Sequence, residues 1–127
     1  MPVAATVRDM TQIRECGRTV AGDIVAFDIQ WDGELEGDDV AWAALVCSVD
    51  QEEIHLVHRL VGGTAQQYVE GERGRQDVEV DSDVREDDVI VRFPANVVGV
   101  AVDWPTWVAV LVVDGEEVAR QAIPLRG

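Results

Sequence analysis

The chain has 127 residues and a formal net charge of −15, because 25 Asp and Glu residues stand against ten arginines and no lysine. Binding to nucleic acid or to an anionic membrane surface needs a basic stripe, and these arginines are scattered among acids. The longest apolar runs, 97–102 and 107–113, are far shorter than a membrane-spanning helix.

Valine dominates the apolar residues, with 24 copies against six leucines and six isoleucines. Side chains branched at Cβ fit the pleated surface of a sheet better than a helix, so this composition favours strands. In chain order, the segments with strand-like patterns are 3–16 (one or two strands), 24–31, 40–49, 54–61, 65–69, 77–81, 89–93, 107–113 and 117–125.

Three of these segments indicate which faces they bury. In 24–31 the apolar residues fall on alternate positions and share one face, while Asp28 and Gln30 lie on the other, as in a half-buried strand. The run 40–49 is apolar on both faces and predicts a central strand. The run 77–81 alternates strictly, with acids on one face and valines on the other.

Turn signals separate the segments. Residues 50–53 form a polar turn, 62–63 are two glycines that break the pattern, and 71–75 predict a loop. Residues 94–98 are compatible with one helical turn between strands. The Asp-Gly pair in 114–116 predicts a hairpin, because both residue types tolerate the positive φ of a tight turn.

Eight or nine short strands, with turn signals every eight to twelve residues and no convincing amphipathic helix, predict an all-β fold. We expect a single antiparallel β-sandwich domain over residues 1–127, of jelly-roll or immunoglobulin-like type. A small β-barrel is the alternative.

The acid excess together with the missing lysine is typical of proteins from extreme halophiles. Self-repulsion destabilises such a chain in dilute buffer, whereas in molar salt the Debye length falls to about 3 Å. A GC-rich genome explains arginine in place of lysine but leaves the acid excess unexplained. Residues 1–9 lack the basic and apolar regions of a secretory signal, so we expect a cytoplasmic chain unless it forms part of a virion.

Two acidic loops, 32–39 and 81–88, carry candidate calcium ligands. The first has alternating carboxylates and a glycine at the sixth place, as in an EF-hand loop, but Ala43 stands at the twelfth place. The second has Arg85 at its fifth place. A solvated acidic surface is the alternative, and we expect no metal and no cofactor. The candidate metal ligands are Asp32, Glu34, Glu36, Asp38, Asp81 and Asp83.

No motif for catalysis stands out, so we expect that the chain is not an enzyme. Only two serines occur, and neither lies in a Gly-x-Ser-x-Gly elbow. His55 and His58, three residues apart, point to opposite faces of a strand and cannot chelate one metal. Cys47 is expected as a buried free thiol, and a disulfide with Cys16 would require neighbouring strands.

The four tryptophans divide into two pairs. Trp31 and Trp42 fall on core-facing positions of expected strands. Trp104 and Trp107 flank a proline at the start of a strand and point to opposite sides, which is compatible with one ring in the core and the other at the surface; the alternative is that both rings lie in the core. An exposed tryptophan can stack on a sugar or anchor a protein interface. Trp104 and Trp107 are therefore the candidate interface residues.

These observations favour a non-enzymatic structural or interaction module of a larger assembly in a halophile, in the first place a virion component such as a capsid decoration or tail-associated protein. Its partners would be other protein subunits in a homo- or hetero-oligomer, with no nucleic acid and no membrane. The alternative is a carbohydrate- or calcium-binding β-sandwich module. A small β-barrel enzyme acting on a hydrophobic substrate is the third hypothesis.

Overall fold

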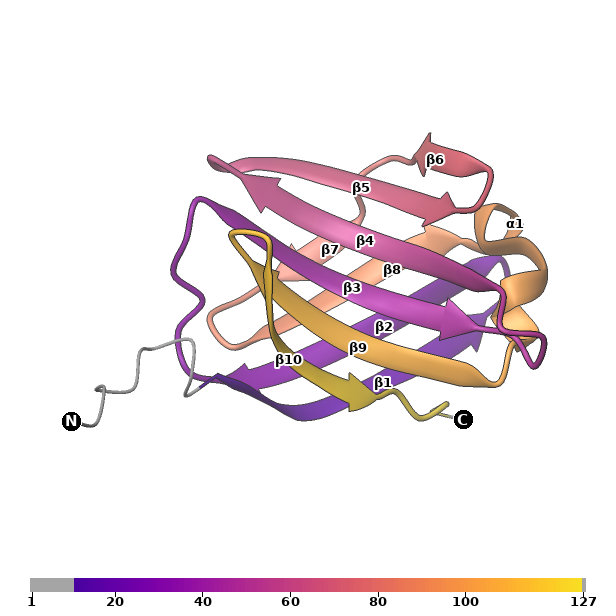
Figure 1. Cartoon of the computed structure of the whole chain (residues 1–127), viewed down its shortest axis with the longest axis horizontal. Helices are drawn as coiled ribbons and strands as arrows, with labels where there is room; N and C mark the ends of the chain where they lie inside the picture. The colour runs from indigo at the N-terminus through magenta and orange to yellow at the C-terminus, as the bar shows by residue number, and fades with distance from the viewer. Residues whose placement is uncertain (1–10, 127) are drawn as a thin grey trace.

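The computed structural model describes residues 11–126 and consists of two layers of strands (Figure 1). The elements in chain order are β1 (Gln12–Ala21), β2 (Ile24–Asp32), β3 (Asp39–Cys47), β4 (Glu53–Val61), β5 (Thr64–Gly71), β6 (Gly74–Asp77), β7 (Ser82–Val84), β8 (Asp88–Pro94), the one-turn helix α1 (Ala95–Val98), a 3₁₀ turn (Gly99–Asp103), β9 (Thr106–Val113) and β10 (Glu116–Ala122).

The strands form two antiparallel sheets. The four-stranded sheet has the order β1-β2-β8-β7, and the six-stranded sheet has the order β10-β9-β3-β4-β5-β6. In Figure 1 the six-stranded sheet lies in front, with β2 and β8 behind β3 and β9. The predicted all-β, antiparallel sandwich is confirmed, and the sheets are not closed into a barrel.

The core lies between the two sheets and contains the alternate residues of β2. All the apolar positions predicted to share one face of this strand are buried, and the residues between them are partly exposed. Phe27 stacks on Phe93 of the neighbouring β8, with ring centroids 6.2 Å apart. Trp31 reaches the opposite sheet, where its ring centroid lies 5.7 Å from that of Trp42 in β3. These aromatic rings therefore join the layers.

The run 40–49 forms a central strand, as its composition predicts. β3 lies between β9 and β4 in the six-stranded sheet and is buried on both faces. Trp42 and Ala44 face the inter-sheet core, whereas Ala41 and Ala43 belong to a second apolar cluster on the outer face of the same sheet. One strand thus contributes to two separate clusters, because neighbouring residues of a strand point to opposite faces.

The predicted hairpin at 114–116 joins β9 to β10. Asp114 and Gly115 have φ values of 51° and 81°, as the two central residues of a type I′ turn require. The helical turn expected at 94–98 is α1. Among residues 11–126, no helix has the length and apolar composition needed to cross a membrane.

The run 77–81 is not a strand, contrary to the alternation of its acids and valines. It crosses from β6 at the edge of one sheet to β7 at the edge of the other. The N–H of Val78 donates to the carbonyl of Gln67 at 3.0 Å, and only Val78 of its two valines packs against the core. Val80 is 43% exposed. A chain that passes between two layers cannot keep one face on the core along its length, so the alternation does not reflect strand pairing.

The loop predicted at 71–75 is shorter than expected. Gly71 pairs with Gly74, and β6 continues from there as a four-residue edge strand whose residues are all exposed. No apolar alternation marks such a strand, because neither of its faces lies on the core. It brings the number of strands in the described residues to ten, against the eight or nine expected.

β7 (Ser82–Val84) matches no expected strand, and β1 was located only in part. The expected segment 3–16 overlaps its first part only, and residues 3–10 lie outside the described residues. β1 is an edge strand with an irregular register between Ile13 and Glu15, which interrupts the two-residue period of its buried positions. Its far end bonds to the last described residues, since the N–H of Arg18 donates to the carbonyl of Pro124 at 3.0 Å.

Candidate functional site

The outer face of the six-stranded sheet carries a stripe of apolar side chains on the side turned away from the inter-sheet core. They form a packed cluster of their own. We call this stripe the apolar face, and it consists of Ala41, Ala43, Leu45, Val57, Tyr68, Val108, Val110 and Val112. The sequence produces it because β3 and β9 are apolar at consecutive positions, so that each presents one set of side chains to the core and another set outward.

The middle of the apolar face is hollowed into a shallow trough. Ala43 pairs with Val110 of β9 on one side and with Val57 of β4 on the other, so the smallest side chain lies between two larger ones. The trough has a volume of about 340 Å³. The exposed fractions of its best-buried residues run from 7% for Ala41 to 9% for Tyr68. The bottom of the trough is therefore apolar, and the longer side chains around it stand higher.

Two ion pairs form the rims of this trough. Arg59 donates from Nε to Asp39 at 2.8 Å and from Nη2 to the second carboxylate oxygen. On the opposite side, Arg120 donates to both carboxylate oxygens of Glu117, at 2.8 and 2.5 Å. The two guanidinium groups lower the pKa of Asp39 and of Glu117 below their usual values. Bidentate pairs hold their geometry better than single hydrogen bonds, so these rims are well defined.

A third arginine, Arg75 of β6, lies over Tyr68, the residue of β5 at the end of the apolar face. The guanidinium carbon of Arg75 is 3.7 Å from the centroid of the Tyr68 ring, in cation–π geometry. Its Nε also donates to Asp77 at 2.8 Å. Arginine and tyrosine are enriched at the centres of protein interfaces, where lysine, glutamate and aspartate are depleted.

The lining of the trough is close to electrically neutral. Its charged residues are three acids (Asp39, Glu70 and Glu117) and two arginines (Arg59 and Arg120), which leaves a formal charge of −1 with His55 neutral. The acids around the trough are thus nearly balanced by arginines, and an approaching molecule meets charges of both signs around the apolar floor.

The outer face of the four-stranded sheet is different, because ion pairs span it. Arg92 donates to Asp81 at 3.2 Å and to Asp83 at 2.8 Å, and Arg14 donates to Asp32 at 2.8 Å. Exposed pairs of this kind contribute little stability and keep the surface hydrated. The sandwich thus has one polar outer face and one apolar outer face.

The six predicted calcium ligands are not brought together. Within residues 11–126, no three His, Cys, Asp or Glu side chains gather as a metal site requires. Three of the six accept the arginine hydrogen bonds described above. Glu34 and Glu36 contact each other, which raises the pKa of Glu34. Asp38 lies apart from them, at the opening of a cavity.

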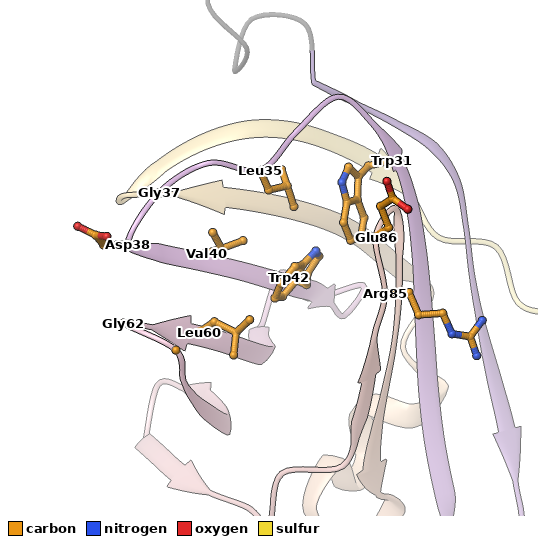
Figure 2. A pocket seen from close by; sticks show the side chains of 11 residues that line it. Trp31, Leu35, Gly37, Asp38, Val40, Trp42, Leu60, Gly62, Arg85 and Glu86 are labelled. Carbon is orange, nitrogen blue, oxygen red and sulfur yellow. The ribbon is translucent and has the colours of Figure 1, made fainter.

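That cavity lies at one end of the sandwich, between the two sheets, and has a volume of about 440 Å³. We call it the mouth cavity. Figure 2 shows its apolar side chains from both layers and from the loop that follows β2. The lining residues are Trp31, Leu35, Gly37, Asp38, Val40, Trp42, Leu60, Gly62, Gly63, Arg85 and Glu86.

The two candidate interface tryptophans differ in burial. Trp107 is 2% exposed, and its Nε1–H donates to the carbonyl of Trp104 at 3.1 Å. Trp104 is half-buried and lines a groove of about 600 Å³ at the other end of the sandwich, together with Val100 and Arg73. Trp107 thus lies in the core, and Trp104 packs against the edge of the same core with part of its side chain exposed. Their role at an interface stays a prediction.

Sequence reasoning missed a buried polar network between the sheets. His58 lies on the inner face of β4 and is 1% exposed, while His55 lies on the outer face, as the predicted opposite orientation requires. His58 Nδ1–H donates to Gln67 Oε1 at 3.3 Å, and its Nε2 accepts from the Ser82 hydroxyl at 3.3 Å. Gln67 in turn donates to the carbonyl of Arg92 at 2.6 Å. The only sequence signal for this network was one polar residue, His58 or Gln67, at a core-facing position of each of the neighbouring strands β4 and β5.

Both cysteines are free thiols. Cys16 is buried in β1 and donates to the carbonyl of Ala122 at 3.2 Å, and Cys47 ends β3 half-buried. Burial raises the pKa of both thiols. Neither has the low pKa that activates a cysteine nucleophile.

Comparison with known proteins adds no relative to these observations: no family model, no curated protein and no solved structure matches the chain.

Proposed function

We propose that this chain is a non-enzymatic interaction module that binds a second copy of itself through the apolar face and so serves as a building unit of a larger assembly. The observation that carries this proposal is the apolar face itself, a packed cluster of eight apolar residues on the outer side of the six-stranded sheet, separate from the inter-sheet core. The apolar floor supplies a surface to bury, and the rim supplies paired charges of both signs.

A second copy fits this face because its chemistry is self-complementary. In a two-fold interface each patch meets an identical patch, so arginines on one rim can face acids on the partner's rim. The rims carry Arg59 beside Asp39 and Arg120 beside Glu117, which meets that condition.

High salt strengthens association through such a face. Screening removes most of the repulsion between two chains of charge −15, since the Debye length is about 3 Å at 1 M. Burial of valine and alanine surface does not depend on that screening. The dimer should therefore be tighter in molar KCl than in dilute buffer, the reverse of an interface held by charge pairs alone.

Val112→Glu tests the proposal. Val112 is half-buried on the apolar face, so the new carboxylate is solvated in the free chain and desolvated in the dimer. An uncompensated buried charge costs about 3 kcal/mol, and the dimer contains two copies of the substitution, so the dimer should be weakened by at least about a hundredfold. Sedimentation equilibrium in about 2 M KCl should find a dimer for the natural chain and a monomer for the variant.

Ile90→Glu is the matched control, because Ile90 is half-buried on β8 in the four-stranded sheet. It should leave the dimer intact. A natural chain that stays monomeric at high concentration in high salt contradicts the proposal, as does equal loss of the dimer in both variants.

Within this proposal, we favour a virion as the assembly, with the chain as a capsid decoration or tail-associated protein. The polar outer face of the four-stranded sheet would then be turned to the brine, where hydrated carboxylates keep a particle dispersed. The genes that flank the coding sequence test this finer statement. Capsid, portal or tail genes support it, and genes of metabolism contradict it.

A further inference from the structure

The mouth cavity is built from side chains of both sheets and of the loop between β2 and β3. Trp31 and Trp42 form its inner wall, each 3% exposed. Leu35 and Leu60 line its sides, and Asp38 stands at its outer edge (Figure 2). A space of about 440 Å³ that is lined both by apolar side chains and by polar groups has the size of a small-molecule site.

One wall of this cavity holds an unsatisfied polar group. Among residues 11–126, Nε1 of Trp42 is the one buried side-chain nitrogen or oxygen without a hydrogen-bond partner. Figure 2 shows this nitrogen turned toward Trp31 and Glu86, two other lining residues. A buried donor left without an acceptor is costly, so native structures usually provide one. This nitrogen has almost no accessible surface, so an oxygen of a molecule in the cavity would accept from the N–H, and remove that cost, once the neighbouring side chains shift slightly.

The walls of the mouth cavity are held in place by backbone hydrogen bonds. The N–H of Gly62 donates to the carbonyl of Asp38 at 2.8 Å, which joins the turn after β4 to the loop before β3. The N–H of Trp31 donates to the carbonyl of Asp87 at 3.0 Å, which joins β2 to the β7–β8 turn. A site that is formed before binding loses less entropy when a ligand enters.

The charges at the opening exclude anions. Asp38 and Glu86 lie among the lining residues, and both carry negative charge at neutral pH. The guanidinium of Arg85 points away from the cavity in Figure 2 and lies 3.8 Å from Asp88. An incoming carboxylate or phosphate would therefore meet like charge and no free cation.

We propose that the mouth cavity binds a small neutral molecule that has an apolar body and one hydrogen-bond-accepting oxygen, and that this oxygen accepts from the indole N–H of Trp42. The apolar body lies against Leu35, Leu60 and the two tryptophan rings. The site is independent of the apolar face, which is on the outside of the six-stranded sheet.

Three probes of similar size separate the parts of this proposal: acetophenone, which has the carbonyl oxygen; ethylbenzene, which lacks it; and benzoate, which carries a charge. The chain contains four tryptophans, so a ¹H–¹⁵N spectrum has four indole signals. Acetophenone should move the Trp42 indole proton to lower field and bind about tenfold more tightly than ethylbenzene. Benzoate should leave that signal unmoved.

Trp42→Phe keeps an aromatic ring and deletes the N–H. It assigns the Trp42 signal by its loss, and it should bring the affinity for acetophenone down to that for ethylbenzene. Trp104→Phe, at the other end of the sandwich, is the matched control and should keep the tenfold preference. Leu35→Trp, which fills the opening from the loop, should abolish binding of both neutral probes whether or not Trp42→Phe folds.

Three results would overturn the proposal. The first is an unmoved Trp42 signal when the natural chain is titrated with acetophenone, and the second is movement of the Trp104 signal instead. The third is a tenfold preference for acetophenone that persists in Trp42→Phe.

Discussion

At the scale of single residues, His58 connects the two sheets of the sandwich. Its ring lies between Trp42, with centroids 5.8 Å apart, and the polar groups of Gln67 and Ser82. Gln67 Oε1 accepts from both the His58 ring and the backbone N–H of Asp81. Because Gln67 Oε1 is an acceptor, Nδ1 of His58 carries a proton, and in the neutral ring Nε2 accepts from the Ser82 hydroxyl. Burial away from water is what favours this uncharged form.

The protonation of His58 predicts how stability depends on pH. Burial lowers the pKa of His58, and the hydrogen bond with Gln67 opposes this only in part. The folded chain thus binds a proton less readily than the unfolded chain, whose histidine has a pKa of about 6.5. The stability that comes from keeping His58 neutral is fully present above this unfolded-state pKa. It is lost as the pH falls below that value, by at most about 1.4 kcal/mol per pH unit.

Urea unfolding at about pH 7.5 and about pH 5.5, in the same salt, measures this loss. His58→Gln should lower the free energy of unfolding at both pH values. It should also remove the part of the pH dependence that His58 causes. His55→Gln, on the outer face of β4, should keep the difference. Equal pH dependence in the natural chain and His58→Gln would contradict the prediction.

At the scale of elements, the β9–β10 hairpin depends on the backbone conformation of its turn. A Cβ added at Gly115 would meet nothing within 4 Å, so only the φ of 81° restricts the residue there. The hairpin also supports the loop before β3. A Cβ at Gly37 would lie 2.8 Å from the Asp114 carboxylate, and the N–H of Asp39 donates to that carboxylate at 3.1 Å. The turn thus positions an edge of both the trough and the mouth cavity.

Substitutions of Gly115 separate strain from lost contacts. Gly115→Val should lower the free energy of unfolding by about 2 kcal/mol, because a β-branched residue strongly disfavours positive φ. Gly115→Asn should cost less than half as much, since asparagine tolerates this region. Chemical denaturation of the two variants checks the order. Equal costs would show that the turn relaxes to another type.

At the scale of the whole molecule, the two outer faces of the sandwich differ in polarity. The four-stranded sheet turns a lattice of arginine–carboxylate pairs to the solvent, and the six-stranded sheet turns out the apolar face. The remaining acids are spread over loops and edges. The acidic surface of the described residues is therefore interrupted by one apolar area on the outer side of the six-stranded sheet.

The excess negative charge predicts a stability that rises with salt. Raising KCl from about 0.1 M to about 2 M should increase the melting temperature, with most of the gain below about 1 M, where the Debye length has already fallen to about 3 Å. A variant with Asp23→Asn, Asp50→Asn and Glu79→Gln removes three exposed acids and should gain less from salt than the natural chain. A melting temperature that is flat over this range contradicts the prediction.

Several elements were predictable because their signal is local. The alternation in β2, the doubly apolar β3 and the Asp114-Gly115 turn each depend on a few consecutive residues, and all three predictions are confirmed. The predictions failed where the alternation of apolar residues in a segment does not match its pairing with a neighbouring strand. The run 77–81 alternates without forming a strand, and the exposed β6 forms one without alternating.

What the sequence by itself determined is the class of fold and the kind of surface, because β-branched composition, alternation and net charge act at each position independently of the rest of the chain. The candidate sites were decided by the tertiary structure alone. Ala43 lies between Val110 and Val57 only through strand register, and Trp42 faces Trp31 only because two sheets pack together. The six candidate calcium ligands form no group of three in the described residues for the same reason: the fold places three of them beside arginines and brings only Glu34 and Glu36 together, and no spacing along the chain contains that information.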